Sequence, residues 1–198
     1  MLRLGNRARR TALHADGHRL AAVEFGRMSS QFDFILLLAQ SETERLLTER
    51  LGVHGVKIER GPAFASLMER PDCVAVTLRA PDGTTETVLA SYVIAADGSH
   101  SPVRKSLGLP FTGRALPQNY VLGDVHLTGD IPEDQLSIFL ARNGFLAVFP
   151  MGAGRFRFMA TDPDGITGDV DEPSLADVQA LYDRTVGIPA TLLSLIHI

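Results

Sequence analysis

The chain opens with apolar and polar residues that alternate on either side of a turn dipeptide. Residues 8–25 form the sequence ARRTALHADGHRLAAVEF, and its two alternating arms around Asp16-Gly17 predict a β-hairpin. The longest continuous apolar run, FILLLA at residues 34–39, follows and favours a buried strand. The arginines near the N-terminus would also suit an organelle presequence, but the hairpin explains the alternation better.

A helix is expected directly after this strand. Ser41 and Glu44 have the Ser-x-x-Glu spacing of a capping box, in which both side chains satisfy free N–H groups at a helix start. Leucines supply an apolar face as far as Leu51, and Gly52 is suited to end the helix. The pattern therefore predicts a helix from Ser41 to about Leu51, with Gln40 at the junction with the strand.

The middle of the chain consists of short apolar segments separated by proline and glycine turns. The predicted strands are VKIE, AFASLM, VAVTLRA and TETVLA. The next segment, YVIAA at residues 92–96, lacks polar alternation, which is typical of a strand covered on both faces of a parallel sheet. A short helix is expected after it, with Ser101 as N-cap, Pro102 at the first position and Gly108 at its end.

The last third of the chain returns to a β pattern. The predicted antiparallel strands are YVLGDVHLT, QLSIFLAR, GFLAVFPM and RFRFMATD, with turns at Asn143-Gly144 and at residues 152–154. Ser174, with Asp177 three residues later, opens a further helix with an apolar face. Residues 191–198 show no pattern that predicts an element and are left as an unassigned tail.

Composition excludes several classes of function. A formal net charge of −4 argues against a general nucleic-acid binder, and the longest apolar run is too short to span a bilayer. The six histidines show no ligand spacing with cysteine or carboxylates, so no metal site is predicted. The single cysteine, Cys73, rules out an internal disulfide and fits a reducing, cytoplasmic location.

The most informative segment is VIAADGSHSPVRKSLG at residues 93–108. A strand that ends in a tight turn before a helix brings backbone N–H groups to the carboxyl edge of a sheet, where α/β folds bind phosphorylated cofactors. Asp97 and Gly98 occupy that turn, and His100 and Arg104 add donors suited to phosphate. The alternative is a structural turn followed by a solvated basic helix, and the local spacing leaves both interpretations open.

This segment resembles the Asp-Gly fingerprint of the class A flavoprotein monooxygenases, the para-hydroxybenzoate and phenol hydroxylase family. The segment LLLAQSETERLL is similar to the family segment whose glutamine reaches the flavin, and the β-rich run from FTGRALPQNY onward resembles the substrate-domain sheet. The resemblance covers most of residues 10–162. It implies an α/β (mixed α+β) fold, made of part of a Rossmann-like FAD-binding domain and a β-sheet substrate domain.

The resemblance also implies which residues bind cofactors. Gln40 is expected to contact the ribityl or pyrophosphate part of FAD, and Ala63 to lie near the adenine through its backbone. Asp97 and Gly98 are expected on the pyrophosphate side of FAD, while His100 and Arg104 match positions that the family links to NAD(P)H. No catalytic acid or base is assigned. Five phenylalanines are candidates either for a substrate pocket or for the core: Phe139, Phe145, Phe149, Phe156 and Phe158.

Two family signatures are missing from the sequence. The Gly-x-Gly-x-x-Gly unit that takes the FAD pyrophosphate is not found, and neither Gly123-Asp124 nor Gly129-Asp130 precedes a helix as the family's second Gly-Asp motif does. The sequence is therefore expected to be the middle of a longer enzyme and to be inactive alone. The expected division is a hairpin of the substrate domain at 1–36, a partial FAD domain at 37–112, a β-rich substrate domain at 113–190 and the tail at 191–198.

The function that the resemblance implies is FAD-dependent, NAD(P)H-using monooxygenation of a small aromatic substrate, phenolic or polyketide-like, by O₂. A homodimer is one candidate assembly. The alternatives are a related FAD-dependent halogenase or reductase of the same fold, or a non-catalytic ligand-binding module.

Overall fold

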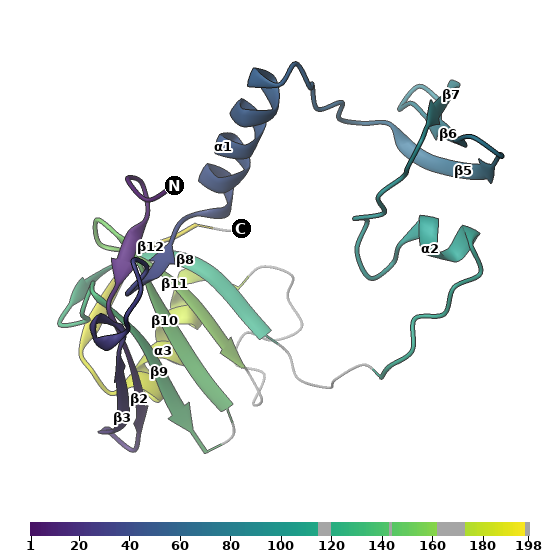
Figure 1. The fold of residues 1–198 in the computed structure, drawn as a ribbon. Coiled ribbons are helices and arrows are strands. Elements are labelled where there is room, and N and C mark those ends of the chain that lie inside the picture. Colours follow the sequence, from purple (N-terminus) through teal and green to yellow (C-terminus); the bar gives the residue numbers. More distant parts are fainter. Residues whose placement is uncertain (115–119, 143, 162–172, 197–198) are drawn as a thin grey trace. The chain divides into compact units, whose positions relative to one another are not determined.

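The computed structural model describes residues 1–114, 120–142, 144–161 and 173–196 (Figure 1). The chain divides into two compact units, one made of Met1–Glu49 with Pro117–Ile198 and the other of Arg50–Leu116. Among the described residues, no helix has the length and apolar character needed to cross a membrane.

A seven-stranded sheet dominates the first unit (Figure 1). Its order is β12-β8-β11-β10-β9-β2-β3, and every neighbouring pair is antiparallel except β2 with β9, which is parallel. The strands are β2 (Arg10–Ala15), β3 (His18–Glu24), β8 (Tyr120–Gly129), β9 (Gln135–Ala141), β10 (Gly144–Gly152), β11 (Arg155–Thr161) and β12 (Ala190–Ile196). The four strands predicted in the last third of the chain are confirmed. The predicted turn at Asn143-Gly144 includes residue 143, which lies outside the described residues.

The predicted N-terminal hairpin is formed by β2 and β3. Its two turn residues, Asp16 and Gly17, have φ values of 50° and 75°, the left-handed conformation that type I′ hairpin turns require. Aspartate and glycine tolerate this conformation better than most residues, which explains why the dipeptide turns the chain here. A short 3₁₀ turn, η1 (Phe25–Arg27), follows the hairpin.

Helix α3 (Leu175–Val186) packs its buried side chains against the seven-stranded sheet, and together they form the core of the first unit. It begins as predicted, since the Ser174 hydroxyl accepts a hydrogen bond from the Asp177 amide (3.2 Å) and the Asp177 carboxylate accepts one from the Ser174 amide (2.9 Å). Tyr182 is fully buried, stacks on Phe158 at 5.6 Å between ring centroids, and donates its hydroxyl proton to the Ile188 carbonyl (2.9 Å). Burial of the phenol raises the Tyr182 pKa well above its usual value.

The five candidate phenylalanines divide between the two faces of the sheet. Phe139, Phe156 and Phe158 are buried in the same cluster as α3 and form core. Phe145 and Phe149 alternate with buried core residues along β10, so their side chains lie on the opposite face and remain partly exposed.

The tail left unassigned from the sequence is largely ordered as β12. Residues 190–196 pair antiparallel with β8, and Leu192 is buried at 5% exposure. No strand was predicted here because polarity does not alternate strictly along residues 191–196, where Leu192-Leu193 and Leu195-Ile196 are adjacent apolar pairs. The tail is thus a sheet strand, which corrects the prediction for residues 191–196.

A two-stranded antiparallel ribbon and a helix complete the N-terminal region. β1 (Asn6–Ala8) pairs with β4 (Ile35–Leu37), so the strand predicted at residues 34–39 is shorter than expected and only half-buried. α1 (Gln40–Val53) starts one residue before the predicted position. Ser41 lies inside its first turn. The Glu44 carboxylate accepts a hydrogen bond from the side-chain amide of Gln40 (Nε2, 2.9 Å) instead of closing the predicted capping box.

The end of α1 also lies beyond the predicted glycine. Gly55, at φ 73°, is the left-handed residue that ends the helix, and Gly52 remains within it. The Val56 amide donates to the Leu51 carbonyl and the Gly55 amide to the Gly52 carbonyl, each at 3.0 Å. This pair of hydrogen bonds is a Schellman motif, which satisfies carbonyls that the helix leaves free.

The second unit contains a three-stranded antiparallel meander and one short helix. The strands are β5 (Ala63–Glu69), β6 (Val74–Arg79) and β7 (Thr85–Ala90), and α2 (Pro102–Ser106) packs against β5. The strand predicted at residues 56–59 is not formed.

The strand predicted at residues 92–96 is also not formed. Tyr92 and Ile94 are each 90% exposed. A parallel strand is stable only when hydrogen-bonded neighbours and covering helices bury it, and the described part of this unit pairs no strand with the segment. The apolar character that predicted a buried strand is therefore left exposed.

Candidate functional site

The Asp97 loop and α2 form one locally closed structure in the second unit. Ser101 caps α2 by accepting a hydrogen bond from the Arg104 amide (2.9 Å), and Pro102 follows at the first helical position. The helix ends at Leu107, with Gly108 in the left-handed conformation at φ 66°. The helix start and end predicted from the sequence are both confirmed.

Asp97 holds the loop against this helix. Its carboxylate accepts a hydrogen bond from the Val103 amide at 3.2 Å. A hydrogen bond with the Ser101 side chain, then the Val103 amide and the nearby Arg104 charge, lower the Asp97 pKa below its usual value. Asp97 is therefore ionised, and part of its hydrogen-bonding capacity is used within the chain.

Gly98 leaves the backbone of the loop accessible. It has φ 79°, and a Cβ placed there would meet no atom within 4 Å. Open space beside a left-handed glycine allows a ligand to approach the main chain closely. This geometry is compatible with the cofactor interpretation, and a structural turn would also require glycine here.

Arg104 is folded back onto the loop. Its Nη1 donates to the Ser99 carbonyl (2.8 Å), and its guanidinium lies 4.7 Å from the centroid of the Phe111 ring. Its Nε is buried and has no hydrogen-bond partner. The His100 ring is exposed, and its Nδ1 lies 3.2 Å from the Ser99 hydroxyl. Arg104 is thus held against the loop, whereas Lys105 on the same helix is exposed.

The structure brings four of the six predicted cofactor residues together in this loop and helix: Asp97, Gly98, His100 and Arg104. Ala63 is the exposed first residue of β5, the strand against which α2 packs. Gln40 is the exposed first residue of α1 and belongs to the other unit, where its amide donates to Glu44.

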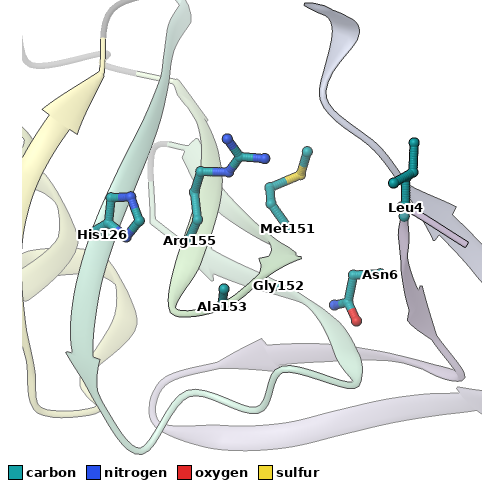
Figure 2. A pocket seen from close by; sticks show the side chains of 8 residues that line it. Leu4, Asn6, His126, Met151, Gly152, Ala153 and Arg155 are labelled. Carbon is teal, nitrogen blue, oxygen red and sulfur yellow. The ribbon is translucent and has the colours of Figure 1, made fainter. Parts of the chain in front are cut away.

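A second feature, which the sequence did not single out, is a hollow of about 500 Å³ on the seven-stranded sheet, here called the Arg155 hollow (Figure 2). Its lining residues are Leu4, Gly5, Asn6, His126, Met151, Gly152, Ala153 and Arg155. Figure 2 shows His126, Arg155 and Met151 on three adjacent strands, with Leu4 and Asn6 forming the wall beside Met151.

The Arg155 hollow is built by the turn between β10 and β11. Gly152, Ala153 and Gly154 all have positive φ values, of 89°, 56° and 71°. The Asn6 amide donates to the carbonyls of Glu133 (2.7 Å) and Pro150 (2.8 Å), which ties β1 to the end of β10. The hairpin turn predicted at residues 152–154 is therefore confirmed, and it also forms the floor of a hollow.

An ion pair lies on the same face of the sheet. Arg157 donates to both carboxylate oxygens of Asp124, at 2.7 and 3.3 Å, and the side chains are only 21% and 8% exposed. Asp124 and His126 alternate along β8, as Arg155 and Arg157 do along β11, so all four lie on the face opposite α3. Sequence reasoning missed them because only the register between β8 and β11 brings them together.

Comparison with known proteins agrees with this fold. The family described as "FAD binding domain" matches residues 1–198. The chain is 34% identical over 160 residues to a 6-methylpretetramide 4-monooxygenase of Streptomyces rimosus, an alignment that covers 79% of the chain and 28% of that enzyme. The chain thus spans less than a third of the length of this curated relative.

Solved structures show the same architecture. The p-nitrophenol 4-monooxygenase of Pseudomonas putida superimposes with a TM-score of 0.76 at 20% identity, over 97% of the chain and 50% of that protein. A flavin-dependent halogenase superimposes with a TM-score of 0.75 at 15% identity, over 98% of the chain and 38% of that protein. The predicted mixed α/β fold, the predicted FAD cofactor class and the resemblance to flavoprotein hydroxylases are therefore confirmed, and the chain belongs to the FAD-binding domain family that includes the aromatic-ring monooxygenases.

Proposed function

We propose that this chain is part of a FAD-dependent monooxygenase that uses NAD(P)H and O₂ to hydroxylate a small aromatic, phenolic or polyketide-like substrate. The observation that carries the proposal is the match of the FAD-binding family along the whole chain, combined with the ordered Asp97-Gly98 loop. Bound FAD would supply the redox chemistry, while the protein binds, orients and shields the reactants.

The proposed cofactor contacts follow the positions that the sequence indicates. Gln40, Ala63, Asp97 and Gly98 would hold FAD, the first through its amide and the last through open backbone. His100 and Arg104 would meet NAD(P)H. Residues 37–112 would contribute to the FAD domain, and residues 1–36 with 113–190 to the substrate domain.

The hydrogen bonds at the start of α2 bear on which part of FAD these residues would hold. The amides of Val103 and Arg104, at the start of α2, are already bonded to Asp97 and Ser101. A helix start whose N–H groups are satisfied has little left to offer a pyrophosphate. In place of the pyrophosphate contact expected from the sequence, we therefore propose that Asp97 would bind a hydroxyl group of FAD.

The test is an enzyme extended to the length of its relatives. It should purify yellow and consume O₂ with NAD(P)H in the presence of a phenol. A colourless enzyme, or one that oxidises NAD(P)H without O₂ uptake, would exclude the proposal. The 198-residue chain alone should lose FAD on desalting, and a flavin-to-protein ratio near one would show a complete dinucleotide site within these residues.

A halogenase is the second candidate function, because the halogenase fold matches nearly the whole chain. Chloride-dependent formation of a halogenated product, in place of a hydroxylated one, would identify it.

The single cysteine and the negative net charge support a cytoplasmic enzyme with no nucleic-acid partner. A homodimer is proposed as its assembly, to be tested by the mass of the extended enzyme in solution.

A further inference from the structure

We propose that the Arg155 hollow binds an ionised oxygen carried by an aromatic ring of the substrate. The inference rests on the proposed function, because it assigns one part of an aromatic substrate to residues of the seven-stranded sheet. It concerns recognition and adds no chemical step.

The two arginines of β11, Arg155 and Arg157, differ in their ion pairing. Arg157 is neutralised by Asp124, whereas Arg155 has no carboxylate within 4.0 Å in the described part of the chain. The charge of Arg155 acts on Glu42, whose carboxylate is already engaged by Arg45 at 2.8 Å. Hydrogen bonds from Arg45, and to a smaller extent the charge of Arg155, lower the Glu42 pKa. Of the two arginines of β11, Arg155 is therefore the one that remains available to a ligand.

Arg155 has a second hydrogen-bond donor, His126, as its neighbour across the sheet. His126 on β8 is directly opposite Arg155 on β11, so the two side chains are cross-strand neighbours on one face. Both line the same hollow (Figure 2). A guanidinium and an imidazole N–H can donate to a single oxygen from two directions, and a charged donor strengthens such a bond.

Apart from Arg155 and His126, the residues that line the hollow are mostly apolar or small. Met151 and Leu4 provide apolar surface beside Arg155, and Gly5 and Gly152 add no side chain to fill the space. A volume of about 500 Å³ lies within the range of small-molecule pockets. The apolar wall suits an aromatic ring, and the two donors suit an oxygen on its edge.

A phosphate group fits less well than a ring-bound oxygen. The Gly154 amide at the turn is already bonded to the Glu133 carboxylate at 3.1 Å. That carboxylate places a negative charge beside the turn, which disfavours a multiply charged phosphate. A singly charged phenolate or aromatic carboxylate avoids much of this repulsion.

The test measures binding of three probes to the 198-residue chain without flavin. The probes are 4-nitrophenolate at mildly alkaline pH, nitrobenzene, which has the ring but no ionised oxygen, and inorganic pyrophosphate, which has charge but no ring. The variants are Arg155→Met and Arg155→Lys. Arg142→Met is the control, because Arg142 lies between β9 and β10, before the end of β10 that is far from Met151.

The expected result is that Arg155→Met weakens 4-nitrophenolate about 10- to 100-fold and leaves nitrobenzene unchanged, while Arg155→Lys keeps part of the affinity. The control should bind like the parent chain. Equal affinity of parent and Arg155→Met for 4-nitrophenolate, or pyrophosphate binding as tight as 4-nitrophenolate, would overturn the proposal. Because neither FAD nor O₂ takes part, this result is separate from that of the monooxygenase test.

Discussion

Asp124 and Arg157 face each other across β8 and β11 and form a two-point ion pair that is largely hidden from solvent. The pair neutralises Arg157, one of the two arginines of β11. Phe149 and Met159 lie beside Arg157 on the same face, and Arg155 lies at the start of the strand. Along β11, this face is thereby divided into a neutral part and a charged end.

Breaking this pair should destabilise the first unit. In Asp124→Asn the guanidinium of Arg157 stays largely buried but loses its counter-charge, which is expected to lower the free energy of unfolding by about 3 kcal/mol. Urea unfolding followed by circular dichroism measures the change. The double variant Asp124→Leu/Arg157→Met removes both charges and should recover most of the loss. If it unfolds as easily as Asp124→Asn, the cost does not come from the unpaired charge.

The capping box of α3 gives a second, smaller expected effect. Ser174→Ala removes the acceptor of the Asp177 amide and should cost about 1 kcal/mol of unfolding free energy. Ser29, an exposed serine outside any helix or strand, is the matched control, and Ser29→Ala should be neutral. Thermal unfolding of both variants tests this, and equal melting temperatures would show that the cap contributes nothing.

The same cap makes stability depend on acid. Hydrogen bonds from Ser174 lower the Asp177 pKa, so the folded state releases this proton more readily than the unfolded chain. The contribution is present above the unfolded pKa and is lost as the pH falls through the folded value. Ser174→Ala should therefore show a shallower loss of stability in acid than the parent chain.

Most strands, and the two serine-capped helices α2 and α3, could be predicted from residues that lie close together in the sequence. The Asp16-Gly17 hairpin, the four strands after residue 118 and the Ser174 cap each depend on residues close together in the chain. The errors arose where distant partners decide the outcome. Residues 92–96 look like a buried strand but have no neighbouring strand among the described residues, and β12 forms only because β8 offers an edge.

The candidate site divides in the same way. The Asp97 loop could be predicted because its motif is contiguous, from Asp97 to Gly108. The Arg155 hollow could not, because it depends on the register of β8 with β11 and on Asn6, which bonds to carbonyls more than a hundred residues away. No periodicity in a single segment carries that information.

His14 should give the sheet a second acid sensitivity. Its ring stacks on Phe139 at 4.7 Å, its Nε2 is buried without a partner, and burial, with the charge of Arg19, lowers its pKa. The unfolded chain therefore binds this proton more readily, and stability is lost as the pH falls below about 6.5. His14→Phe keeps the stacking and should reduce the drop in melting temperature between neutral and mildly acidic pH. His18→Gln, on the same hairpin but exposed, should not.

Arg104 can be assigned to one cofactor in the extended enzyme. Arg104→Ala should raise the KM for NAD(P)H by about tenfold and leave FAD content unchanged, since it removes a charge-assisted contact to a phosphate. Lys105→Ala, the next residue of α2, is the control for charge alone. Loss of FAD with unchanged NAD(P)H kinetics would instead place Arg104 at the flavin.

The attachment of β12 depends on the absence of a side chain at Gly129. A Cβ at this position would lie 2.6 Å from the Ala190 Cβ and 2.7 Å from the Pro189 carbonyl oxygen, both fixed by the pairing of β12 with β8. Gly129→Ala must therefore push the start of β12 away, and a cost of about 1–3 kcal/mol is expected, as for other overpacked positions. Gly26→Ala is the matched control, because a Cβ there meets nothing within 4 Å. Hydrogen exchange separates a local effect from a global one: amides of β12 should lose protection in Gly129→Ala, while those of β9 and β10 keep it. Unchanged protection along β12 would show that the strand tolerates the methyl group and that the close approach at Gly129 is not required for its docking.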